Sequence, residues 1–114
     1  MLTAARDEKK RLLASLRARF ESKGPFPRPP SDREIQYLHG DLAEYDFYSA
    51  RDISRVLDGK KPYRRYERNE ALEKRILGLL AAMPQFSEIL GRYLEIYRGL
   101  QEMIGIAEKI RRVW

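Results

Sequence analysis

The sequence predicts an all-α protein of about five helices, on three observations. Apolar residues recur at intervals of three and four in each long segment, as they do on one face of a helix. Alternation with a period of two, which marks a strand, fails in every window of the chain. A hydrophobic fraction of 43% with a charged fraction of 35% is typical of a charge-rich helical protein. At this length we expect a single helical domain over residues 1–114.

An N-terminal helix is predicted within residues 1–24. Leu12, Leu16 and Phe20 recur in it at helical spacing. Residues 25–30, PFPRPP, then contain four prolines. A helix cannot pass through such a segment, because proline lacks the backbone N–H and its ring clashes with the preceding turn. We therefore expect an extended connector there.

Two helices are predicted within residues 31–66. The first begins at Ser31, and Glu34 stands at the spacing of a capping box. The second begins with Ser49 as its N-cap and ends at Gly59, where a left-handed backbone suits glycine. The three residues before Ser49, DFY, are expected to interrupt the helical pattern. The predicted buried side chains of the two helices are Ile35, Leu38, Leu42, Ile53, Val56 and Leu57.

A C-terminal helical pair is predicted over residues 67–114, with Pro84 between its two members. Apolar residues of the second member repeat every seven positions in three rows, which correspond to heptad positions a, d and e. A face of this width predicts contacts with several neighbouring helices. These neighbours belong either to the same chain, with the first helix folded back, or to another copy in a homo-oligomer. The residues expected to form the oligomer contact are Tyr93, Tyr97, Leu100, Ile104 and Trp114.

The composition argues against an enzyme. There is no Cys, which excludes disulfides, thiol nucleophiles and Cys-based zinc sites, and His39 is the single histidine. No phosphate-binding loop or hydrolase motif is present. We therefore expect no catalytic residues, no cofactor and no metal. Because no segment has the apolar length of a signal peptide or a membrane span, we expect a cytoplasmic protein without a membrane partner.

The charge predicts a polyanionic partner. Lys and Arg exceed Asp and Glu by 23 to 17, a net charge of +6. Residues 51–68 hold seven Lys or Arg against three acids, which places +4 in 18 residues. Tyr63 and Tyr66 lie among these cations and have the chemistry to bond phosphates or stack on unpaired bases. Nucleic acid is the expected ligand, and a solvated charged loop is the alternative.

Residues 41–61, DLAEYDFYSARDISRVLDGKK, resemble the helix-turn-helix unit of lambda-repressor-like proteins. The second and third helices of that family commonly follow L-A-x-x-x-G-h-S-x-x-x-I-S-R-x-L-x-G, where h is apolar. One departure is Phe47, which stands where the family usually has glycine. The matching residues are Leu42, Ala43, Tyr48, Ser49, Ile53, Ser54, Arg55, Leu57 and Gly59.

The resemblance implies a division of labour on DNA. The outer face of the second of the two helices, with Arg51, Ser54 and Arg55, would reach base edges in a major groove. The residues after that helix would hold the phosphate backbone. This second group consists of Lys60, Lys61, Tyr63, Arg64, Arg65 and Arg68.

The sequence therefore predicts a non-enzymatic nucleic-acid-binding protein. The first expectation is a small helix-turn-helix regulator of transcription, bound to duplex DNA and dimeric through its last helix. The second is a helical subunit of a nucleoprotein complex that binds RNA or DNA backbone without sequence preference. A protein-interaction module, such as an inhibitor that docks on an enzyme, is the third.

Overall fold

The computed structural model describes residues 2–62 and 70–113, with side chains from residue 4 onward. The described residues are mostly helical, and no strand occurs among them, as the sequence predicts. Four α-helices and one short 3-10 helix are present in the described part of the chain, where the sequence predicts about five helices. The elements are α1 (Leu2–Ser22), α2 (Arg33–Leu57), α3 (Glu70–Ala82), η1 (Pro84–Phe86) and α4 (Ser87–Arg112).

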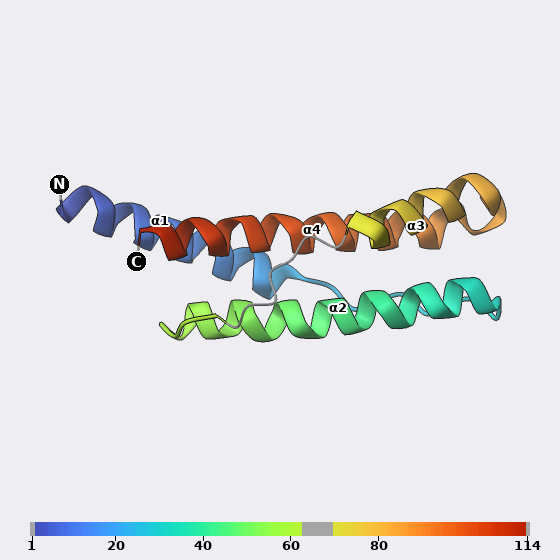
Figure 1. Ribbon diagram of the computed structural model, residues 1–114, viewed down its shortest axis with the longest axis horizontal. Coiled ribbons are helices and arrows are strands. Elements are labelled where there is room, and N and C mark those ends of the chain that lie inside the picture. The colour runs from blue at the N-terminus through green and yellow to red at the C-terminus, as the bar shows by residue number, and fades with distance from the viewer. Residues whose placement is uncertain (1, 63–69, 114) are drawn as a thin grey trace.

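The helices form a rod of 53 × 22 × 21 Å (Figure 1). The two long helices, α2 and α4, run parallel to each other for most of its length. The two shorter helices run in the opposite direction: α1 lies along the C-terminal half of α4, and α3 along its N-terminal half. Each cross-section is therefore a three-helix bundle, whose third position is occupied first by α1 and then by α3.

The wide face of α4 is covered within the chain. Tyr93, Tyr97, Leu100 and Ile104, the described residues expected to form an oligomer contact, are at most 3% exposed. Leu12 and Leu16 of α1 belong to the same core cluster, so the N-terminal helix does fold back on α4. Of the two alternatives, the folded-back first helix is the one observed, and it leaves no open apolar face around Leu100 and Ile104, because α1 and α2 cover this half of α4. Trp114 lies outside the described residues.

Residues 33–57 form one continuous helix, not the two helices and turn of a helix-turn-helix unit. The DFY segment contains neither glycine nor proline, so nothing in it ends a helix. The buried stripe also passes through it at heptad spacing, with Tyr45 before it and Ser49 after it. Ser49 is a 2%-exposed residue in mid-helix and not an N-cap. Tyr45 is half-buried, and the fully buried residues of α2 are Ile35, Leu38, Leu42, Ser49, Asp52, Ile53 and Val56.

The start of α2 also differs by one residue from the prediction. Asp32, not Ser31, is the N-cap, and its carboxylate accepts a hydrogen bond from the backbone N–H of Glu34 at 2.9 Å. A carboxylate here both caps an otherwise unpaired N–H and lies at the positive end of the helix dipole. The extended connector before it, residues 25–30, carries no helix, as predicted.

Polar aromatic contacts join α2 to α4. His39 Nδ1 and the Tyr93 hydroxyl are hydrogen-bonded at 2.5 Å, and Phe26 of the connector packs edge-on against the His39 ring. Farther along both helices, Tyr45 stacks on Tyr97 with ring centroids 6.0 Å apart. Burial raises the pKa of Tyr93 to about 12, because its neutral hydroxyl is favoured away from water.

The continuity of α2 predicts the effect of changing Phe47, which is 63% exposed in mid-helix. Phe47→Gly is expected to be less stable than Phe47→Ala by about 1 kcal/mol, because glycine is the poorer helix former. Urea unfolding followed by circular dichroism measures the difference. A turn with a left-handed residue would reverse the order, so a more stable glycine variant would refute the continuous helix.

The buried Tyr93 hydroxyl predicts a loss of stability in alkali. Its folded pKa of about 12 exceeds the ordinary value of 10.0, so the contribution is complete below pH 10 and is lost as the pH rises toward 12. Tyr93→Phe is expected to cost about 1 kcal/mol at pH 7, through the lost hydrogen bond. Between pH 10 and 12 its stability should fall less steeply than that of the wild type, by up to about 1.4 kcal/mol per pH unit.

Urea unfolding at pH 7, 10 and 11.5 tests this. Tyr37→Phe is the matched control, because it removes the same hydroxyl from a side chain that is 69% exposed. If the unfolding free energies of both variants change equally with pH, the buried Tyr93 hydroxyl is not the cause of the alkaline loss of stability.

Candidate nucleic-acid interface

The end of α2 is closed by a glycine turn. Gly59 has a φ of 78°, the left-handed region that the sequence predicts for it. The N–H of Gly59 bonds to the carbonyl of Val56 at 3.1 Å, and that of Lys60 to the carbonyl of Arg55 at 2.8 Å. This pair of bonds is the Schellman motif, which satisfies carbonyls left open at a helix end. It turns the chain sharply, and residues 60–62 stay close to the end of α2, where Arg55 bonds to the carbonyl of Lys61.

A small pocket lies where this turn meets the last turns of α4. It has a volume of about 260 Å³ and is lined by Val56, Lys60, Lys61, Pro62 and Arg111. Arg55 supports one wall, because its Nε donates a hydrogen bond to the carbonyl of Lys61 at 2.8 Å. The pocket therefore combines an apolar surface, from Val56 and Pro62, with three cationic side chains.

Three chain segments with an excess of cations meet at this end of the rod. They are residues 4–13 of α1, residues 51–62 at the end of α2, and residues 105–113 at the end of α4 (Figure 1). We call them together the basic end. They contain eleven Lys or Arg and five Asp or Glu, a difference of +6 that equals the net charge of the whole chain. The nine exposed cations among them are Arg6, Lys10, Arg11, Arg51, Lys60, Lys61, Lys109, Arg111 and Arg112.

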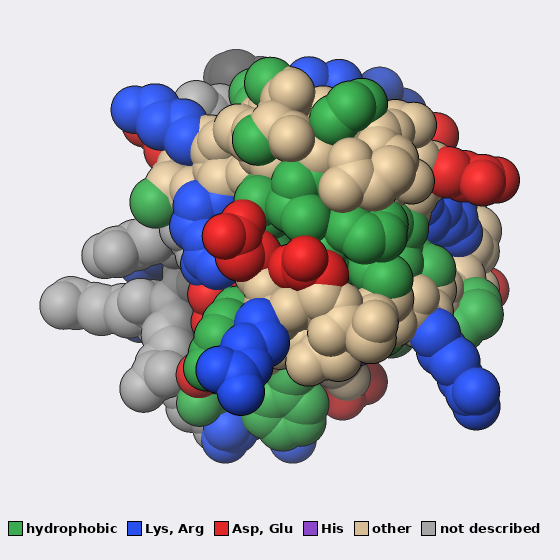
Figure 2. All heavy atoms as spheres, turned by 90° about the vertical axis from the view of Figure 1, so that its right-hand side faces the viewer, with side chains coloured by type: hydrophobic (Ala, Val, Ile, Leu, Met, Phe, Trp, Pro, Cys, Tyr) green, Lys and Arg blue, Asp and Glu red, His purple; other side chains and the backbone are tan. Residues whose placement is uncertain are grey.

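The rest of the described chain has the opposite balance. Residues 14–50 and 70–104 contain nine Lys or Arg and eleven Asp or Glu, a difference of −2. Five of the nine cations form ion pairs with carboxylates; these are Arg19–Glu102, Lys23–Asp46, Arg75–Asp41, Arg92–Glu95 and Arg98–Glu73. Figure 2 shows the end opposite the basic end, where cations and acids are mixed around hydrophobic side chains. The positive field is therefore directed along the rod.

Helix dipoles account for part of this distribution. The C-termini of α2 and α4 lie at the basic end, and cations there stabilise the negative end of each dipole. The same reason does not apply to α1, whose N-terminus lies at this end. Its first turn holds no acid, yet Arg6 and Lys10 follow closely. Asp7 and Glu8 lie between these two cations, and residues 4–13 as a whole contain four Lys or Arg and two Asp or Glu.

The structure brings part of the sequence-predicted site to this surface. Arg51 and Ser54 are exposed on α2, and Lys60 and Lys61 are exposed beyond it. Arg55 is half-buried and holds the Lys61 carbonyl, so it shapes the turn. The remaining predicted residues, Tyr63, Arg64, Arg65 and Arg68, lie outside the described residues.

Sequence reasoning missed the contributions of α1 and α4. Lys10 lies 50 residues before Lys60, and Arg111 and Arg112 lie about 50 residues after it. Counting charges in a sequence window cannot show that such distant segments lie close together in the fold. The available signal was that both ends of the chain are basic.

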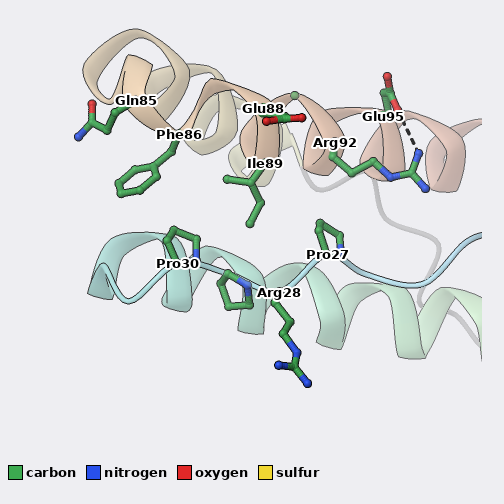
Figure 3. A pocket seen from close by; sticks show the side chains of 11 residues that line it. Pro27, Arg28, Pro30, Gln85, Phe86, Glu88, Ile89, Arg92 and Glu95 are labelled. Carbon is green, nitrogen blue, oxygen red and sulfur yellow. Dashed lines mark hydrogen bonds and ion pairs between the residues drawn. The ribbon is translucent and has the colours of Figure 1, made fainter.

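A larger groove of about 770 Å³ lies between the connector and the start of α4 (Figure 3). Phe86 and Ile89 point across it toward the prolines, and Arg28 points away from it. Arg92 pairs with Glu95 at 3.2 Å, and Glu88 lies on the same side of α4. Because the charged lining residues balance, the groove does not indicate the charge of a ligand.

Comparisons of the chain with protein-family models, with curated proteins and with solved structures find no match. The resemblance to lambda-repressor-like proteins therefore stays a prediction, and the turn that it implies is not found. In residues 2–62 and 70–113, no group of three or more His, Asp or Glu could hold a metal ion. No described helix is long and apolar enough to span a bilayer.

The glycine turn predicts the cost of a substitution there. Gly59→Ala is expected to destabilise the protein by about 1–2 kcal/mol, because a side chain at φ 78° meets the following carbonyl. Gly40→Ala is the matched control. Gly40 lies in the middle of α2, and a methyl group there meets nothing within 4 Å, so helix propensity should make this variant more stable. Thermal and urea unfolding measure both changes, and equal effects would contradict the left-handed turn.

Proposed function

We propose that this protein is a non-enzymatic nucleic-acid-binding protein that holds the sugar–phosphate backbone at its basic end, without reading base sequence in a groove. The observation that carries the proposal is the excess of +6 in three segments that meet at one end of the rod. Charge arranged in this way attracts polyanions over a Debye length and orients the rod end-on toward them.

The size of the basic end fits a short stretch of nucleic acid. The rod is about 21–22 Å across, which spans roughly six phosphates of one strand at 3.4 Å per nucleotide. Nine exposed cations are sufficient to contact several of these phosphates. Each contact would release a condensed counterion, so affinity would depend steeply on salt.

Backbone binding is favoured here over groove reading. A helix-turn-helix unit places a second helix in the major groove after a sharp turn, and α2 passes through residues 46–48 without one. Arg55, expected to reach a base edge, bonds to its own chain. The dimer that would pair two recognition helices also loses its support, because Leu100 and Ile104 are buried in the bundle. A nucleoprotein subunit is thus the better of the two nucleic-acid expectations.

Neutralising cations outside the pocket tests the proposal. The variant Lys10→Ala, Lys109→Ala and Arg112→Ala is expected to bind duplex DNA, single-stranded DNA and RNA more weakly by a similar factor. Its slope of log affinity against log salt should fall by up to about 2–3, because at most three phosphate contacts are lost. Fluorescence anisotropy with labelled oligonucleotides between 20 and 200 mM salt gives both quantities.

The matched control removes the same charge elsewhere. Arg28, Arg33 and Lys74 are exposed cations outside the basic end, and their triple alanine variant should keep the wild-type slope. An equal loss in both triple variants would show that charge alone, and not its position, governs binding. Failure to bind any nucleic acid at 20 mM salt, or binding only to anionic lipid vesicles, would overturn the proposal.

A further inference from the structure

We infer that the pocket between residues 60–62 and α4 holds one unpaired nucleotide, so that the protein prefers single-stranded nucleic acid to duplex. This inference rests on the proposed function and adds to it the form of nucleic acid that is bound. The chemistry required is a flat, largely apolar ring joined to a phosphate.

The lining of the pocket suits both the ring and the phosphate of a nucleotide. Val56 and Pro62 provide an apolar surface, and the three remaining lining residues, Lys60, Lys61 and Arg111, are all cations. No carboxylate is among its described lining residues, so this part of the lining does not repel an anion. A phosphate can pair with the lysines, while a base can stack on the guanidinium plane of Arg111 or on the Pro62 ring.

A duplex cannot use the apolar part of this site. Its bases are stacked inside the helix and present only edges in the grooves, so a convex duplex surface offers the pocket hydrated phosphate and sugar. An unpaired base offers a whole ring face, which gains by leaving water. With about 260 Å³, the pocket is small for a ligand site and is suited to one ring system.

The pocket is also formed before a ligand arrives. The Schellman bonds of Gly59 and Lys60 fix the turn, and the Arg55 side chain holds the carbonyl of Lys61. Pro62 adds a fixed φ to the same short segment. Because little chain entropy is lost on binding, a single nucleotide contact can contribute measurably to affinity.

The test compares two neighbouring arginines. Arg111 lines the pocket and Arg112 does not, and both are exposed cations in the last turn of α4. Arg111→Ala is expected to weaken binding of a 15-nucleotide oligo(dT) about tenfold and to change duplex binding less than about threefold. Arg112→Ala should weaken both about equally and by less than about threefold. Circular dichroism should show unchanged helix content in both variants.

A second variant tests the apolar surface without any change of charge. Pro62→Ser should reduce oligo(dT) affinity several-fold and leave duplex affinity within about twofold, at the same salt. The wild type should bind oligo(dT) and oligo(U) about tenfold more tightly than a 15-base-pair duplex.

The source of the nucleotide is distinguished by competition with uridine monophosphate. Displacement of oligo(dT) at millimolar concentration would support a pocket open to free nucleotides. Strand preference without displacement would support a pocket filled only by a base within a strand. Equal affinity for oligo(dT) and duplex, with equal effects of the two arginine changes, would overturn the inference while leaving backbone binding intact. Absence of binding to every nucleic acid would overturn both.

Discussion

The burial of the wide apolar face of α4 is the constraint on which the rest of the structure depends. Leu90 and Ile110 are fully buried although they lie about 160° apart around the axis of α4, so neighbours must cover this helix from more than one direction. Three of the described helices, α1, α2 and α3, share the task of covering α4. α2 covers one side along most of the length, and α1 and α3 share the other. The hydrophobic driving force thus selects a long, thin bundle over a compact repressor-like domain.

This arrangement also decides where the charge lies. Because α2 and α4 are parallel and α1 runs in the opposite direction, the C-termini of two helices and the N-terminus of a third lie at the same end of the rod. Segments that are basic for separate local reasons therefore lie at one end of the rod. The glycine turn at Gly59 then places Lys60 and Lys61 next to Arg111 and forms the small pocket. Packing, and not a local motif, assembles the candidate site.

Two buried polar residues give the middle of the chain two conflicting local patterns. Ser49 and Asp52 lie in the core stripe of α2, each 2% exposed. A serine before an apolar run is also the usual signature of an N-cap. Local pattern therefore favoured a helix start at Ser49, while the heptad spacing from Leu42 through Tyr45 to Val56 favoured continuity. Tertiary packing against α4 resolves this conflict in favour of the longer helix.

The sequence by itself determined the helical class, the connector, the buried rows of α4 and the stop at Gly59, since each depends on spacing or on the backbone limits of one residue type. Only the tertiary structure decided that α1 folds back on α4, that α2 is continuous, and that Lys60 and Arg111 line one pocket. Residues 50 positions apart become neighbours through the direction and order of packed helices. The apolar face of one helix shows that this face must be buried. Which helix buries it depends on how all the apolar faces of the chain pack together.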